Sequence, residues 1–384
     1  MERRGVAIGI GATCRGVWHT AKATLLYSPS NALLPFVALG IAAGELGWSP
    51  AAVFILNFLA MFPLASILTF STEQLAAKVG AVMGGLINAT FGNAVEMIVG
   101  ISALREKEVG IVQSSMIGSM LSSILLILGS CFFAVGLRDT LVTINRDIGA
   151  ILTSLMIISC ASLVVPAALY ATDSADFPID EPSERILALS RFASTVLLLL
   201  YVVYIIFQTW THAHLFSDAC EDENDADQLS TFASAVVLVI ATLGISVTSD
   251  YLVDSVDGLV ETLGISRGFI GLIVVPIVGN ASCFVATVQW ALSGKIQLAV
   301  SVIVGSTLQI SLFVTPFLVI LGWIIGSPMS LQFDTFETVV LTMSVLVVHC
   351  LVRDGSTNYF EGLLLIATYL VIGIAFFVHP DAAR

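Results

Sequence analysis

Long apolar stretches without Asp, Glu, Lys or Arg dominate this sequence. Crossing the hydrocarbon core of a bilayer takes roughly 20 residues of helix. Eight uncharged stretches reach that length: residues 23–44, 46–72, 109–137, 148–171, 192–217, 228–249, 268–294 and 296–333. Only 11% of the 384 residues are charged, which leaves too little polar surface for a water-soluble globule of this size. The chain is therefore predicted to be an all-α, polytopic integral membrane protein.

The same stretches set the expected number of helices. Two shorter uncharged runs, 338–352 and 362–378, follow near the C-terminus, and the run 296–333 must hold more than one span. We count residues 74–104 as one further span although Glu96 lies inside it. This gives about ten to eleven transmembrane helices.

Charge and cysteine usage exclude several classes of function. The chain carries 15 Lys and Arg against 28 Asp and Glu, a net charge of −13, which argues against nucleic acid and favours cations as partners. Its six cysteines are scattered singly, so neither a disulfide framework nor a zinc module is expected. The sequence has no H-E-x-x-H motif and no matching pair of catalytic carboxylates, so we do not expect an intramembrane enzyme.

Polar segments divide the chain. Residues 1–30 are predicted to be an N-terminal cytosolic tail and 31–49 the first transmembrane helix. With eleven helices, nine basic residues would lie inside and six outside, which favours a cytosolic N-terminus. Residues 217–228 form an acidic linker with six acids between positions 218 and 227. The linker is either a solvated joint between two halves or an acidic helix that concentrates cations near a pore mouth.

The two halves carry the same motif at the same spacing. Gly92-Asn93-Ala94 precedes Gly118-Ser119 by 26 residues, and Gly279-Asn280-Ala281 precedes Gly305-Ser306 by the same 26. Glycine loosens a helix, and asparagine inside a membrane is costly unless it is hydrogen-bonded or lines a hydrated cavity. Duplicated broken helices of this kind point to the binding site of a transporter, where freed backbone groups coordinate ions.

Glu96 is the acidic residue nearest to the first break. It follows Asn93 by three residues, which places both on one helix face about one turn apart. A carboxylate inside a membrane indicates a functional site. Because Glu96 can bind a cation when ionised and carry a proton when neutral, it provides the minimal chemistry of an antiporter.

Longer motifs around these residues resemble a known family. Residues 84–98 (GGLINATFGNAVEMI) and 112–123 (VQSSMIGSMLSS) are similar to the first repeat of the calcium/proton exchanger (CAX) family. Residues 249–261, 268–282 and 305–323 look like its second repeat. The resemblance covers nearly the whole chain.

The resemblance implies a fold and a function. The expected fold has eleven helices in two inverted five-helix repeats, 50–216 and 229–379. The expected function is exchange of Ca²⁺ for H⁺ in a lipid bilayer without a covalent cofactor, in a vacuolar or other acidic endomembrane. A homo-oligomeric state is left open.

The resemblance also implies a set of ion-site residues. Asn93 and Glu96 would be central ligands of the first repeat, with Asn280 opposite. Gln113 and Gln309 would line the site. Glu73 and Asp250 fall where the family has acidic residues near the ion path.

The Gly-Asn motif of the second repeat departs from the family pattern. The family motif ends in Glu-His, where this chain has Cys283 and Phe284. Two carboxylates can exchange two protons for one divalent ion without net charge transfer, whereas one cannot. A free thiol, with an ordinary pKa of about 8.5, does not replace the charge unless a soft metal or a nearby positive charge ionises it. Three interpretations remain open. In the first, Glu73 or Asp250 supplies the missing negative charge. In the second, the site prefers a softer or monovalent cation, with Cys283 as a ligand, and in the third the chain is a degenerate paralogue with poor transport.

Overall fold

Helices make up almost all of the chain that the computed structural model describes, which is residues 18–139, 142–173, 184–212 and 229–378. The acidic linker predicted at 217–228 lies outside these residues, as do positions 1–17 of the predicted tail. The first half contains η1 (Pro29–Leu33), α2 (Pro35–Glu45), α3 (Pro50–Ala76), α4 (Ala81–Phe91), α5 (Ala94–Arg105), α6 (Val109–Leu121), η2 (Ser122–Ile127), α7 (Leu128–Gly136), β1 (Val142–Thr143), α8 (Arg146–Asp173), α9 (Glu184–Ile206) and η3 (Phe207–Thr211).

The second half follows the same order of long and broken helices. It contains α10 (Thr231–Asp254), α11 (Val256–Leu263), α12 (Arg267–Phe269), η6 (Ile270–Val274), α13 (Val275–Gly279), α14 (Ala281–Leu292), α15 (Ile296–Gln309), η7 (Ile310–Val314), α16 (Thr315–Ile325), α17 (Thr335–Asp354), β2 (Ser356–Thr357) and α18 (Tyr359–Val378). The prediction of an all-α membrane protein is confirmed.

Eight helices of the described chain are long and apolar enough to cross a membrane, and two bent helix pairs raise the number to ten. One bent pair joins residues 18–26, which lie in the predicted tail, to residues 29–45, which overlap the predicted first helix at 31–49, and the pair is bent by 104°. The other pair, Arg267–Gly279 and Ala281–Leu292, is bent by 56°. Counting α4 and α5 as one more broken span would give eleven, a number that stays a prediction.

The middle helices of the two halves recur at one offset. The first residue of α5, Ala94, and that of α14, Ala281, are 281 − 94 = 187 positions apart. The starts of α6 and α15 differ by 296 − 109 = 187, and those of α7 and α16 by 315 − 128 = 187. A π-helical turn, η2 or η7, interrupts the long helix after each glycine-serine motif. The structure thus repeats the spacing of the sequence, while the inverted orientation of the repeats stays a prediction.

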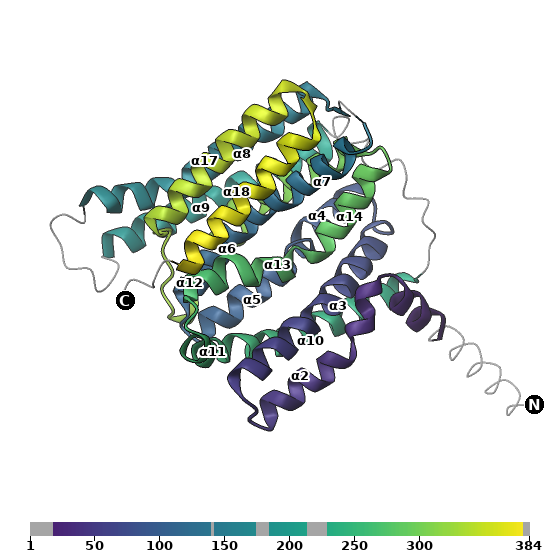
Figure 1. Cartoon of the computed structure of the whole chain (residues 1–384), viewed down its shortest axis with the longest axis vertical. Helices are drawn as coiled ribbons and strands as arrows, with labels where there is room; N and C mark the ends of the chain where they lie inside the picture. Colours follow the sequence, from purple (N-terminus) through teal and green to yellow (C-terminus); the bar gives the residue numbers. More distant parts are fainter. Residues whose placement is uncertain (1–17, 140–141, 174–183, 213–228, 379–384) are drawn as a thin grey trace, which may run out of the picture.

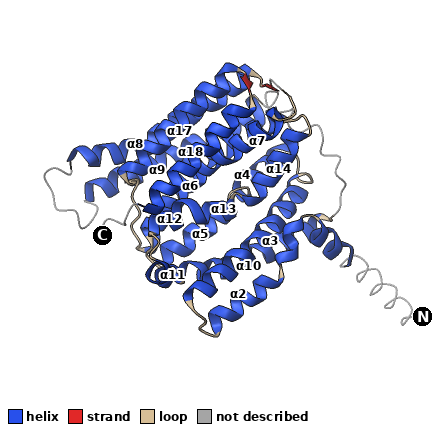
Figure 2. Cartoon of the chain, in the orientation of Figure 1, coloured by secondary structure: helices blue, strands red, loops and turns tan. Residues whose placement is uncertain are grey.

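The broken helices lie in the interior of the bundle. Figure 1 shows α4, α5, α13 and α14 between α2, α3 and α10 on one side and α6, α7 and α18 on the other. In agreement with this view, α5 packs on α10 and α6, and α14 packs on α3, α7 and α15. Outside the helical bundle, β1 and β2 form a short antiparallel pair that joins the two halves (Figure 2). The helix breaks are therefore enclosed by long helices from both halves.

Candidate cation site

Both Gly-Asn motifs interrupt their helices. Asn93 stands between α4 and α5 with φ −116° and ψ 27°, outside the helical region. Asn280 occupies the corresponding position between α13 and α14. Because glycine offers no side chain to pack and asparagine favours local hydrogen bonds, the sequence ends the helix at both places. Two polar breaks are thereby placed inside an apolar bundle.

Asn93 reaches across to the second half of the chain. Its Nδ2 donates a hydrogen bond to Oε1 of Gln309 at 2.7 Å, and its Oδ1 accepts one from the Ser306 hydroxyl at 3.0 Å. Asn93 is 2% exposed, and both partners lie on α15. The buried Asn93 amide therefore makes these hydrogen bonds with α15, the helix that follows the second break.

Asn280 makes the reciprocal contact with the first half. Its Oδ1 accepts a hydrogen bond from the Ser123 hydroxyl at 3.3 Å, and its Nδ2 donates to the backbone carbonyl of Ser119 at 3.4 Å. Ser119 and Ser306 occupy equivalent positions, since 306 − 119 = 187. Each asparagine thus contacts the glycine-serine helix of the opposite half, so the two motifs form one cluster.

Glu96 lies in the first turn of α5 and faces the second break. Its side chain is 6% exposed, and an added Cβ at Gly279 would lie 2.7 Å from Oε1 of Glu96. A side chain at 279 would require the Glu96 carboxylate to move from this position. Oε2 of Glu96 is buried without a hydrogen-bond partner. A carboxylate oxygen in that state fits an incoming cation or a proton, because an unsatisfied buried acceptor is otherwise costly.

The second repeat places a thiol where the first has Glu96. Cys283 and Glu96 are 283 − 96 = 187 positions apart, and the Cys283 thiol is within electrostatic range of the Glu96 carboxylate. The hydroxyl of the neighbouring Ser282 accepts a hydrogen bond from Thr69 of α3 at 3.1 Å. The cluster therefore contains one carboxylate, two amides, several hydroxyls and a thiol.

Gln113 does not join this cluster. Its Nε2 donates hydrogen bonds to the backbone carbonyls of Ser330 and Gln332, both at 2.9 Å. These residues belong to the segment between α16 and α17. The expectation that Gln113 lines the cation site is thus not supported by its contacts. Gln309, its predicted counterpart, does contact the cluster through Asn93.

Glu73 and Asp250 also lie away from the cluster. Asp250, near the end of α10, forms a 3.4 Å ion pair with Arg105 in which both side chains are solvent-accessible. Glu73, near the end of α3, accepts a hydrogen bond from Tyr27 at 3.1 Å. Glu73 follows Thr69 by four residues, one helical turn from the Ser282 contact. Both acids lie near the ends of their helices. Neither acid is part of the cluster.

Comparison with known proteins decides the family. The family model described as sodium/calcium exchanger protein matches residues 49–210 and 233–378. The chain belongs to this family. The matched ranges include both breaks, both glycine-serine motifs and Glu96, and the result confirms the resemblance seen in the sequence.

Individual relatives include proteins named as calcium transporters and Ca²⁺/H⁺ antiporters. A vacuolar calcium ion transporter of Schizosaccharomyces pombe is 41% identical over 363 residues, covering 94% of this chain and 87% of the relative. A Ca²⁺/H⁺ antiporter of Synechocystis sp. is 37% identical over 365 residues, covering 91% and 96%. Among solved structures, native YfkE is similar with a TM-score of 0.76 and 32% identity, covering 90% of this chain and all of that one.

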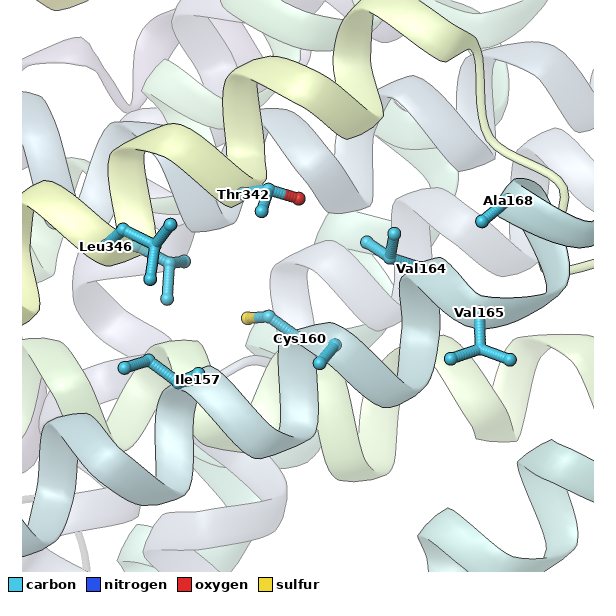
Figure 3. A pocket seen from close by; sticks show the side chains of 9 residues that line it. Ile157, Cys160, Val164, Val165, Ala168, Thr342 and Leu346 are labelled. Carbon is cyan, nitrogen blue, oxygen red and sulfur yellow. The ribbon is translucent and has the colours of Figure 1, made fainter. Parts of the chain in front are cut away.

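An apolar cavity elsewhere in the bundle is separate from the cluster. It has a volume of about 270 Å³ and lies between α8 and α17. Figure 3 shows Cys160 and Thr342 among the aliphatic side chains that line it. A cavity so poor in oxygen ligands does not suit a hard cation.

The structure also supplies residues that sequence reasoning missed. Thr69 had no motif to mark it, and its contact with Ser282 depends on the packing of α3 beside the second break. Glu337 is the second such residue and is buried, with 3% of it exposed. A signal was present, because Asp334 and Glu337 have the spacing of a helix N-cap and its third residue, which puts Glu337 inside the helix.

Neutralising the peripheral acids is expected to have small effects. We expect Asp250→Asn to change the initial rate of Ca²⁺ transport by less than about fivefold, because an exposed ion pair contributes about 1 kcal/mol or less. Glu73→Gln should behave similarly. The measurement is ⁴⁵Ca²⁺ uptake into vesicles holding each purified variant. A loss in either variant as large as that in Glu96→Gln would show that this acid supplies the charge missing at position 283.

Proposed function

We propose that this chain exchanges Ca²⁺ for H⁺ across a vacuolar or other acidic endomembrane, with its N-terminus cytosolic. The observation that carries the proposal is the buried Glu96 carboxylate, which faces Gly279 of the opposite repeat through Oε1 and has no hydrogen-bond partner at Oε2. The relatives named as vacuolar calcium transporters and Ca²⁺/H⁺ antiporters support both the ion and the membrane. No covalent cofactor is needed for such an exchange, and lipid is the surrounding solvent.

The donor atoms of the cluster suit a hard cation. Ca²⁺ prefers six to eight oxygen ligands from carboxylates, amides, backbone carbonyls and water. Glu96 would supply the carboxylate, and Asn93 and Asn280 would supply amide oxygens that now accept hydrogen bonds from Ser306 and Ser123. Breaking these bonds as the ion enters would loosen both asparagines from the opposite repeat. Ion binding is thereby coupled to the contacts that join the two halves.

Glu96 makes the ion and the proton compete. The first turn of a helix carries partial positive charge that favours an ionised carboxylate, whereas the surrounding apolar bundle disfavours an unpaired charge. A bound cation or a bound proton resolves the conflict equally well. Glu96 would therefore release its proton to one side when the cation binds and take up a proton on the other side when the cation leaves.

The test is proton-driven ⁴⁵Ca²⁺ uptake into sealed vesicles that hold the purified full chain. We expect an imposed pH gradient to drive uptake and its collapse by a protonophore to stop it. Excess Mn²⁺, Zn²⁺, Na⁺ and K⁺ serve as competitors. Vesicles that take up no Ca²⁺ under a pH gradient would contradict the proposal. Preferential inhibition by Zn²⁺ would instead favour a softer cation at Cys283.

A further inference from the structure

A second acidic side chain is buried in the bundle and has no role in the cation cluster. Among the described side chains, Glu96 and Glu337 are the acidic residues that are fully buried, 6% and 3% exposed. Glu337 lies in the first turn of α17, where the hydroxyl of Ser114 on α6 donates a hydrogen bond to its Oε1 at 2.5 Å. An acid at such a place is expensive and indicates function.

Glu337 of α17 contacts α6 at Ser114, a position between one surface of the bundle and the cluster. Glu108, before the start of α6, forms an ion pair with Arg267 at 3.1 Å, and Arg267 also pairs with Asp257 at 2.6 Å. Ser114 is six residues further along α6 and Ser119 another five, or about 9 Å and about 7.5 Å of helix. The Glu337 carboxyl is thus held about midway between this ionic layer and the contact of Ser119 with Asn280.

Comparison of the two repeats shows that the acid at 337 occurs in the second half alone. Asp147 and Asp334 are 334 − 147 = 187 positions apart, and the same offset pairs Glu337 with Ala150. The second half thus has an acid at 337 where the first has alanine, and it lacks an acid at 283 where the first has Glu96. The described side chains thus include two buried carboxyls, which are not related by the repeat.

Among the side chains that the structure describes, few titratable groups lie on the elements packed against α17, the helix of Glu337. The elements packed against α17 include α6, η2, β2 and α8, and the first three carry no charged or titratable side chain. On the described part of α8, Arg146 binds the carbonyl of Asp354 at the opposite end of α17, and Cys160 lies in the apolar cavity of Figure 3. On α17, Asp334 caps the helix through the Phe336 amide, and His349 contacts Thr153.

We propose that Glu337 carries the second proton of the exchange cycle. This inference rests on the proposed function, because it assigns the source of the charge that Cys283 does not provide. When Ca²⁺ binds, the O–H bonds of Glu96 and Glu337 both break, each electron pair stays on its carboxylate, and two protons leave to water. Two neutral acids without the ion and two carboxylates with Ca²⁺ have the same net charge, so the exchange leaves the net charge of the interior unchanged.

The number of protons exchanged per Ca²⁺ tests this directly. In vesicles held at zero membrane potential, the logarithm of the final Ca²⁺ ratio rises with the imposed pH difference, and its slope is the number of coupled protons. We expect a slope of about two for the wild-type chain and about one for Glu337→Gln. Glu337→Asp, which keeps the carboxyl, should restore about two. Glu261→Gln, which neutralises an exposed acid on α11, should leave the slope unchanged.

The outcomes separate this inference from the proposed function. Absence of pH-driven uptake in the wild-type chain overturns the function itself. A slope of two in Glu337→Gln, or of one in the wild-type chain, overturns only the role of Glu337. If Glu337→Gln takes up no Ca²⁺ under a pH gradient, exchange of ⁴⁵Ca²⁺ for Ca²⁺, which needs no proton, is measured in the same vesicles. Retained exchange supports the proposal, and its loss in a folded variant overturns it.

Discussion

Glu96→Gln is expected to abolish Ca²⁺ uptake driven by a pH gradient, with an initial rate reduced about 100-fold or more. Glutamine keeps the size of the side chain and its fit against Gly279, but it can neither balance the charge of a cation nor carry a proton. Such a reduction corresponds to about 2.7 kcal/mol, which is modest for removing the charged partner of a buried ion. The measurement is ⁴⁵Ca²⁺ uptake at equal amounts of folded protein in the vesicles.

The matched control for this variant is Glu106→Gln. Glu106 is the C-terminal cap residue of α5, the helix that carries Glu96, and its side chain is exposed. The control variant should transport at the wild-type rate, since the same chemical change is made where no ion is bound. Near wild-type uptake by Glu96→Gln would remove Glu96 from the ion path.

Gly118→Ala is expected to produce the largest loss of stability. An added Cβ at Gly118 would overlap the backbone carbonyl of Leu272 in η6. Neither backbone can rotate out of the way, so α6 and η6 must separate, and η6 leads directly into the second break. We expect the free energy of unfolding to fall by about 3 kcal/mol and the apparent melting temperature of the detergent-solubilised protein to fall by roughly 5 °C.

Gly110→Ala on the same helix provides the comparison. An added Cβ at Gly110 meets no atom within 4 Å, and alanine favours a helix more than glycine by up to about 1 kcal/mol. This variant should melt at or above the wild-type temperature. Equal melting temperatures for the two variants would show that α6 and η6 are not packed as closely as the structure indicates.

The sequence predicts the centre of the site well because local chemistry determines it. Glycine followed by asparagine disfavours a continuous helix, and the equal spacing of 26 residues brings the same elements together in each half. The reciprocal contacts of Asn93 and Asn280 follow from this duplication. His349 is similar, because a histidine in an apolar helix needs a partner within the bundle, and the structure supplies Thr153.

The rest of the site depends on tertiary packing that spacing does not reveal. Gln113 is six residues before Ser119, which contacts Asn280, yet its own side chain donates to the backbone carbonyls of Ser330 and Gln332. Glu337 is close to charged residues in sequence but is buried by α6 and α8 in space. Because both positions depend on how α17 and the preceding loop pack against the first half, no local pattern assigns them.

The central claim, that cation and proton exclude one another at Glu96, is tested most directly by the pH dependence of Ca²⁺ binding to the purified protein. Binding is measured by equilibrium dialysis with ⁴⁵Ca²⁺, and proton release is followed in weakly buffered solution. Protonated Glu96 cannot balance the charge of a cation, so the Kd for Ca²⁺ should rise as the pH falls, and Ca²⁺ binding should release protons. A Kd independent of pH, with no proton released on binding, would contradict the account.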